Sequence, residues 1–228
     1  MIADKIKKYF NFKNGFFLEV GAYDGLFQSN TFFLEKDLNW KGILIEPNFK
    51  YFLQCFKNRP KSIIINCLLT SFENYKKKKY LYGDFNAYSN MKKKWGGGPA
   101  TGGPMSSVLS FRRFYDFWML FEKIRRNFSF VPILNFPLQL ILDELSIVDI
   151  DFFSLDVEGY EYEVLNGINF DKSNIKYICI EIKSFDKEKI FKFLFDRNFI
   201  LIESLTDFNF KNNPNWDGVT NDYLFVKK

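Results

Sequence analysis

Short apolar runs alternate with amphipathic stretches along most of the chain, and this pattern predicts strands and helices in turn. The expected strands cover residues 15–21, 42–46, 62–69, 150–155, 177–182, 199–204 and 223–226. The expected helices cover residues 1–12, 29–39, 48–58, 138–145, 161–167 and 187–198. Strands and helices in this order predict an α/β doubly wound, Rossmann-like sheet of about seven strands, mostly parallel with an antiparallel terminal strand.

The regular pattern stops between about residues 75 and 136. Lysine runs at 76–79 and 92–94 precede a stretch rich in glycine and proline, after which aromatic residues alternate with arginines. We expect one domain, residues 1–228, in which this segment is an insertion or a lid. A disordered insertion and solvated lysine faces are the alternatives. The aromatic part is suited to covering an acceptor, pairing with another subunit or resting on a membrane face.

Two strands end in residues that suit a cofactor. The run from Phe16 to Gly25 places Gly21 and Gly25 after a buried strand, where the missing Cβ lets a ligand approach the backbone. A tight turn without a ligand uses the same glycines. Glu46 ends the next strand about 20 residues further on, where a carboxylate accepts hydrogen bonds from ribose hydroxyls. These positions together indicate a nucleotide-like cofactor.

Four motifs follow one another in the chain. They are Glu19-Val-Gly21-Ala-Tyr23-Asp24-Gly25, Ser29-Asn30-Thr31, Trp40-Lys-Gly42-Ile-Leu-Ile-Glu46-Pro47-Asn48 and Asp156-Val-Glu158-Gly159-Tyr-Glu161. Their order and spacing resemble the FkbM family of S-adenosylmethionine-dependent methyltransferases over residues 15–70 and 138–226. The resemblance implies that S-adenosylmethionine is bound by Glu19, Gly21, Tyr23, Asp24, Gly25, Ser29, Asn30, Glu46, Pro47 and Asn66.

The turn after residue 155 is the expected chemical centre, because an apolar strand ends there in clustered carboxylates. Asp156 and Glu158 are the candidate catalytic residues, with Lys183 after the next strand, where many members of the family carry histidine. The two carboxylates would raise each other's proton affinity, as a base requires, or hold Mg²⁺ through their oxygens. The chain has no histidine, so no imidazole can be the base.

The sequence of the same turn indicates which kind of acceptor atom is methylated. It lacks the Asn-Pro-Pro-aromatic sequence that holds a planar amine, and it has no cysteine to attack a pyrimidine ring. Methylation of oxygen is therefore favoured, and the resemblance implies a sugar, a surface glycan or a similar hydroxylated metabolite as acceptor, with a role in polysaccharide biosynthesis.

Two other functions stay open. Asp156, Lys183 and Glu203 at successive strand ends resemble part of the Lys-Asp-Lys-Glu tetrad of ribose 2′-O-methyltransferases, which would make RNA the acceptor. A net charge of +5 does not by itself indicate nucleic acid. The other alternative is a cofactor-binding interaction module without catalysis.

The amino-acid composition and the apolar runs indicate the environment in which the protein works. The three cysteines share no close spacing, which excludes a zinc or iron-sulfur motif and favours a reducing, cytoplasmic environment. The first residues lack the features of a secretory signal, and no apolar run is long enough to span a bilayer. We expect a protein that is soluble or at most peripheral to a membrane, and an oligomer is possible.

Overall fold

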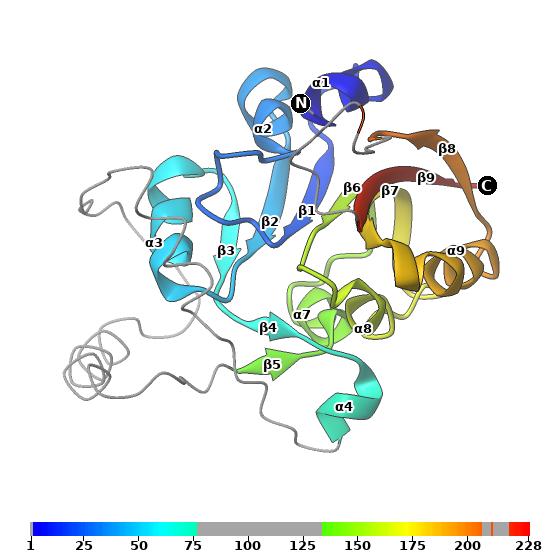
Figure 1. The fold of residues 1–228 in the computed structure, drawn as a ribbon. Helices are drawn as coiled ribbons and strands as arrows, with labels where there is room; N and C mark the ends of the chain where they lie inside the picture. The colour runs from blue at the N-terminus through cyan, green and yellow to red at the C-terminus, as the bar shows by residue number, and fades with distance from the viewer. Residues whose placement is uncertain (1, 77–133, 207–210, 212–218) are drawn as a thin grey trace. The chain divides into compact units, whose positions relative to one another are not determined.

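The computed structural model describes residues 2–76, 134–206, 211 and 219–228, which apart from Leu134 belong to one compact unit (Figure 1). The strands of its main sheet are β1 Phe16–Val20, β2 Lys41–Ile45, β3 Ile63–Ile65, β6 Asp149–Leu155, β7 Asn174–Lys183, β8 Phe199–Ser204 and β9 Thr220–Lys227. They are ordered β3-β2-β1-β6-β7-β9-β8. Neighbouring strands pair in parallel except β9, which is antiparallel to both β7 and β8. The predicted doubly wound sheet with an antiparallel terminal strand is confirmed.

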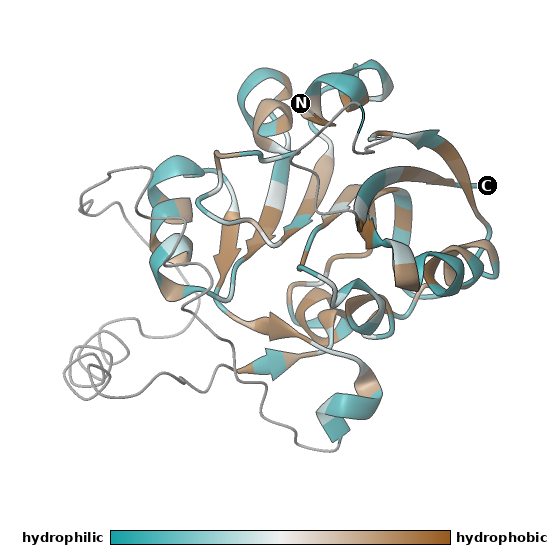
Figure 2. Ribbon diagram, viewed as in Figure 1, coloured by the Kyte–Doolittle hydropathy of each residue, from teal (hydrophilic) through white to brown (hydrophobic). Residues whose placement is uncertain are grey.

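Helices cover both faces of this sheet. Those in the described residues are α1 Ile2–Ile6, η1 Lys7–Tyr9, α2 Phe32–Leu38, α3 Phe49–Asn58, α7 Leu138–Glu144, α8 Glu161–Leu165, η3 Ser184–Asp186 and α9 Lys187–Phe195, together with α4 Phe72–Lys76, which follows the first strand of the small sheet described below. The strands are largely hydrophobic (Figure 2), and successive residues point to opposite faces. Phe17 packs in a cluster with residues of α1, α2 and α3, whereas Leu18 packs with residues of α7, α8 and α9. Both faces are therefore buried, as a parallel sheet requires.

The strand predicted over residues 62–69 is wrong as a single element. Residues Ile63–Ile65 belong to the main sheet, but Leu68–Leu69 form β4, which pairs in parallel with β5, Asn135–Phe136, in a separate small sheet (Figure 1). Asn66 lies at the break, where its amide group donates hydrogen bonds to the carbonyl oxygens of Glu46, at 2.7 Å, and Pro47, at 2.9 Å. These bonds to the end of β2 turn the chain away from the sheet.

The helix predicted over residues 161–167 is shorter in the structure. It ends at Leu165, and its C-cap Asn166 keeps right-handed helical angles. A Cβ on Gly167 would lie 2.3 Å from the carbonyl oxygen of Thr70, so glycine is needed for close packing at this point.

The insertion predicted at about residues 75–136 lies almost entirely outside the described residues, and it stays a prediction. The same holds for its lysine runs, apart from Lys76. Within the described ranges, no helix combines the length and apolar character needed to cross a membrane.

Candidate active site

The parallel strands bring the predicted site residues to one edge of the sheet, because the carboxyl ends of parallel strands lie together. Gly21 follows β1 and Asp156 follows β6, and the Asp156 N–H donates to the Val20 carbonyl oxygen at 3.0 Å. A Cβ on Gly21, where φ is +85°, would lie 1.7 Å from the Asp156 carbonyl oxygen. The close approach that requires glycine is thus made by the turn after β6, which places the expected cofactor loop against the expected catalytic turn.

Glu46 is buried immediately after β2 and is held by the backbone. One carboxylate oxygen accepts the Tyr23 N–H at 2.8 Å, and the other accepts the Asn48 N–H at 2.7 Å. Burial raises the pKa of this carboxyl to about 7, against the lowering effect of the two backbone donors. Each oxygen retains a lone pair for another donor, such as a ribose hydroxyl.

Glu19 lies inside the protein and organises the loop before α2. Its carboxylate accepts hydrogen bonds from Ser29 Oγ at 2.9 Å, the Asn30 N–H at 3.0 Å and Thr31 Oγ1 at 2.6 Å. Ser29 Oγ in turn accepts the Phe32 N–H at 3.1 Å, while the N-cap Thr31 makes no side-chain cap bond. These side chains shape the loop from within.

Arg59 is fully buried and completes the same network. Its Nε lies 2.9 Å from Glu35 Oε2, and its Nη1 lies 3.3 Å from Glu19 Oε2. Nη2 donates to Thr31 Oγ1 at 2.9 Å, and Nη1 donates to the Gly25 carbonyl oxygen at 3.2 Å. The sequence analysis did not identify Arg59, because an arginine before a proline at the end of a predicted helix gives no sign of a buried ion pair.

Tyr23 and Asp24 define the turn between these groups. Tyr23 has a positive φ of 50° and packs against Tyr51, with ring centroids 4.0 Å apart. The Asp24 carboxylate accepts the N–H groups of Leu26, at 2.8 Å, and Phe27, at 2.7 Å. Both residues therefore fix the shape of the expected cofactor loop.

A second set of carboxyl groups lies on the strands β6, β7 and β9, which follow β1 in the order of the sheet. Asp156 follows β6, Glu181 lies near the end of β7, and Asp222 faces Glu181 across the β7–β9 pair. Sequence reasoning missed Asp222, which precedes the strand predicted at 223–226. Its only signal was an acid just before an apolar run, which many loops share.

The pKa values of these carboxyl groups are raised. Burial, and after it the neighbouring carboxylates, raises the pKa of Asp156 and of Glu181 above its ordinary value. Burial also raises the pKa of Asp222 to about 6, although a hydrogen bond from Thr206 opposes the shift. Asp156 nevertheless keeps a solvent-exposed surface, through which an acceptor can reach it.

The turn after Asp156 has a left-handed backbone, with φ of 59° at Glu158 and 99° at Gly159. Glu161 stabilises it by accepting the N–H groups of Val157, at 3.0 Å, and Gly159, at 2.9 Å. Lys183 Nζ donates to the Glu158 carbonyl oxygen at 2.9 Å. Lys183 thus holds the turn, while the Glu158 side chain is exposed to solvent.

Two expectations gain no support from the described part of the chain. Its His, Cys, Asp and Glu side chains form no group of three or more that could hold a metal ion, so the expected Mg²⁺ site at Asp156 and Glu158 is unsupported. Glu203 accepts a hydrogen bond from Tyr9 Oη at 2.6 Å and lies 2.8 Å from Lys8 Nζ. It is therefore held by the N-terminal segment, and the tetrad of the RNA alternative stays a prediction.

The carboxyl edge of this Rossmann-like sheet thus holds a glycine turn after β1, an acid after β2, and acids after β6 and near the end of β7. The family model described as the methyltransferase FkbM domain matches residues 19–210. The chain therefore belongs to the FkbM methyltransferase family and uses S-adenosylmethionine as its methyl donor.

Solved structures with a similar fold include M. capricolum TrmK in complex with S-adenosyl-homocysteine, at 9% identity and a TM-score of 0.47, covering 99% of this chain and 67% of that one. A TehB-like methyltransferase from Corynebacterium glutamicum has 10% identity and a TM-score of 0.48, covering 100% and 87%. The 23S rRNA methyltransferase ErmE has 10% identity and a TM-score of 0.43, covering 100% and 67%. No curated protein matches the chain.

Proposed function

We propose that this protein transfers the methyl group of S-adenosylmethionine to a hydroxyl oxygen of a sugar, a surface glycan or a similar hydroxylated metabolite. The observation that carries the proposal is the pair of carboxyl groups of Asp156 and Glu181, which lie at the ends of the paired strands β6 and β7 beside the Gly21 turn. An alcohol must lose its proton as its oxygen is methylated, and a base with a pKa near the working pH does this best. The raised pKa values of the pair suit that task in a chain without histidine.

The residues around β1 and β2 suit the cofactor. Glu46 is fixed by two backbone N–H groups and has lone pairs left for the ribose hydroxyls. Asn66 uses its amide nitrogen to bind the end of β2, which leaves its carbonyl oxygen to accept a bond from the adenine amino group. The cofactor supplies an electrophilic methyl group on a sulfonium centre.

The side chains of the loop between β1 and α2 position the cofactor site without binding the cofactor themselves. Glu19 holds Ser29 and Asn30 in place, and Asn30 Nδ2 donates to Ser154 Oγ at 3.1 Å, which ties the loop to β6. Tyr23 and Asp24 fix the backbone between Gly21 and Gly25. In this proposal these side chains position the loop, and Pro47 starts the chain segment that Asn66 anchors.

On the acceptor side, Asp156 takes the hydroxyl proton as the new oxygen–methyl bond forms. Bound S-adenosylmethionine would supply the methyl group, and the electron pair of its carbon–sulfur bond would stay on sulfur. Glu181, at the end of the neighbouring strand β7, helps to raise the proton affinity of the site. Glu158 is exposed at the same turn and contacts the acceptor, while Lys183 keeps the turn in this geometry.

The test uses methyl-labelled S-adenosylmethionine with fractionated cell glycans, RNA and small metabolites. Label should enter a hydroxylated glycan or metabolite, and Asp156→Asn should lower turnover about 100-fold while cofactor affinity by calorimetry changes little. Asp171→Asn, at an exposed position, is the matched control. Turnover by the native protein should rise with pH through about 7, where Asp156 becomes ionised.

Three outcomes would overturn parts of the proposal. Label in RNA, or on nitrogen, would reject the acceptor class. Wild-type turnover by Asp156→Asn would reject the base. Activity lost in a chelator and restored by Mg²⁺ would show that a metal, instead of the carboxyl pair alone, activates the hydroxyl.

A further inference from the structure

Exposed lysines gather at the amino ends of the first three strands. We call this surface the basic edge, and its members are Lys13, Lys36, Lys41 and Lys61, all exposed. Lys13 precedes β1, Lys41 begins β2, and Lys61 precedes β3. The methyl-transfer chemistry proposed above uses none of them.

Hydrogen bonds and strand register show that three of these lysines are close neighbours. The pairing of Ile43 with Ile63 in the parallel β2–β3 ladder sets Lys41 beside Lys61 two residues earlier. Lys61 Nζ donates to Asn39 Oδ1 at 3.4 Å, and Asn39 Nδ2 donates to Asn14 Oδ1 at 2.8 Å, next to Lys13 in the chain. The three ammonium groups therefore share one surface.

Helix α2 adds one lysine at this edge. Lys36 lies in the last turn of α2, where the partial negative charge of the helix end favours a cation. None of the four lysines forms an ion pair within the ranges that the structure describes. Asp37 is the acid beside Lys36 in α2, and Asp151, at the start of β6, is neutralised by Lys176 at 2.6 Å.

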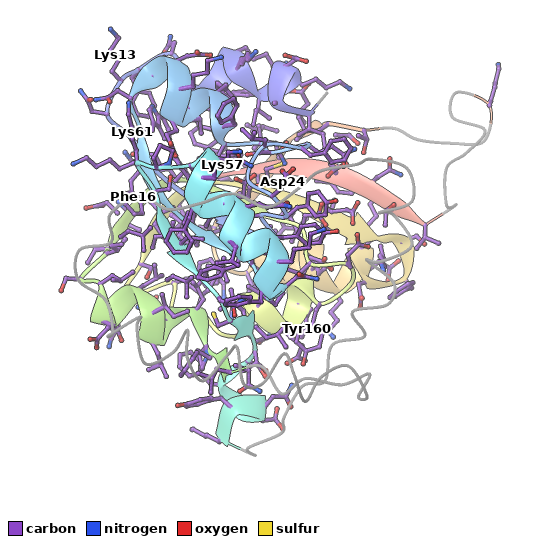
Figure 3. The ribbon with its side chains drawn as sticks, turned by 90° about the vertical axis from the view of Figure 1, so that its left-hand side faces the viewer. Lys13, Phe16, Asp24, Lys57, Lys61 and Tyr160 are labelled. Carbon is purple, nitrogen blue, oxygen red and sulfur yellow. The ribbon has the colours of Figure 1, made fainter. Side chains whose placement is uncertain are left out.

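The basic edge lies opposite the candidate active site. Figure 3 shows Lys13, Lys61 and Phe16, the first residue of β1, on one side, with Asp24 and Tyr160 on the other, whereas Lys57 lies close to Asp24 and does not belong to the basic edge. Asp24 follows β1 and Tyr160 follows β6, so this separation is that of the amino and carboxyl ends of the strands. A partner bound at the basic edge is consequently not the methyl acceptor.

We propose that the basic edge docks the protein on an anionic lipid bilayer. Exposed apolar side chains accompany the lysines: Phe12 is 40% exposed next to Lys13, and Ile63 is 40% exposed two residues after Lys61. Lysine is a point charge on a flexible stem and suits a diffuse negative surface, whereas specific phosphate recognition favours the planar fork of arginine. Aromatic and aliphatic groups beside lysines are typical of contact with the membrane interface.

The proposal predicts the strength of docking and its dependence on charge. Each lysine at an anionic membrane surface contributes about fivefold in affinity, and the attraction falls with added salt. The variant Lys13→Gln, Lys41→Gln, Lys61→Gln should therefore bind about 100-fold more weakly to vesicles of equal parts phosphatidylglycerol and phosphatidylcholine. Co-sedimentation of the full-length protein measures this, and vesicles of phosphatidylcholine alone should retain neither protein.

The matched control removes three exposed lysines elsewhere, Lys189, Lys192 and Lys228, and should bind the anionic vesicles like the native protein. Thermal melting and cofactor affinity should be unchanged in both triple variants, so a failure of docking is separable from a failure of methyl transfer. The proposal is wrong if the native protein does not bind these vesicles or if both triple variants lose affinity equally. It is also wrong if RNA or an acidic polypeptide competes the protein off the vesicles at equal charge concentration.

Discussion

Removal of the Arg59 guanidinium is the most direct test of how the cofactor loop is built. This group is fully buried between the carboxylates of Glu19 and Glu35, whose side chains are each 6% exposed. The variant Arg59→Met fills similar volume but leaves two buried carboxylates without their cation. Breaking a buried ion pair from one side costs about 3–5 kcal/mol, a large share of the roughly 5–15 kcal/mol by which proteins of this kind are stable.

The variant Arg59→Lys distinguishes the contribution of the positive charge from that of the guanidinium hydrogen bonds. Arg59→Lys keeps the positive charge, but a single ammonium cannot reach Glu35, Thr31 and the Gly25 carbonyl oxygen together as the guanidinium does. The loss of one charged hydrogen bond costs about 1.5–3 kcal/mol, so the lysine variant should fall between the native protein and Arg59→Met. Urea unfolding measures the free energy of each.

A second substitution shows whether uncompensated charge is the cause. Glu35→Gln in the Arg59→Met background removes one of the stranded carboxylates and should restore about 1–2 kcal/mol, although Glu35→Gln alone is destabilising. Calorimetry at a temperature where the variants stay folded should show weaker S-adenosylmethionine binding for Arg59→Met. If Arg59→Met unfolds within about 1 kcal/mol of the native protein, or binds the cofactor equally well, the network does not hold the loop.

Two further predictions concern the raised pKa values. The pKa of Asp222 is raised to about 6 by burial, so the stability that its protonated form contributes is complete at low pH and is lost as pH rises through 6. Urea unfolding gives the difference in the free energy of unfolding between Asp222→Asn and the native protein. This difference should favour the variant by about 2–3 kcal/mol more at pH 8 than at pH 4. An equal difference at both pH values would contradict the prediction. Glu46→Gln removes the charge and one of the two oxygens that accept the N–H groups of Tyr23 and Asn48. It should weaken S-adenosylmethionine binding, measured by calorimetry, by about 1.5–3 kcal/mol. The control Glu188→Gln, on the exposed face of α9, should leave the affinity unchanged.

The sequence predicts most of the fold because hydrophobic periodicity is local. The strand expected at 42–46 is found at Lys41–Ile45, and the helix expected at 48–58 is found at Phe49–Asn58. The run over 62–69 failed because apolar character continues through a point where Asn66 binds the neighbouring strand end. A periodicity argument contains no information about such a contact, since its partner lies 20 residues away.

The candidate site is predictable only in part for a similar reason. Gly21, Glu46 and Asp156 stand at the ends of apolar runs, where the chain order alone marks them. Asp222 joins the site through the register of an antiparallel strand pair, and Arg59 joins Glu19 across 40 residues of sequence. Register and long-range ion pairs are set by tertiary packing, which a single sequence does not display.

The acids near the carboxyl edge differ in how their charge is compensated, and this difference separates structure from chemistry. Glu19 and Glu35 contact Arg59, and Glu161 accepts two backbone N–H groups. These compensated carboxylates stabilise loops and turns. Asp156 and Glu181 contact no cation among the described residues, and the pKa of each is raised by burial and by neighbouring carboxylates.

An uncompensated pair of this kind costs stability whenever both members are ionised, because each pKa is raised above that of the unfolded chain. A protein that needed only a stable edge would gain by replacing one of the pair with an amide. The pair instead keeps its raised pKa values next to the Gly21 turn, and Asp156 is open to solvent. The proposed proton transfer from a bound hydroxyl gives a reason for this arrangement, which the compensated Glu19, Glu35 and Glu161 do not share.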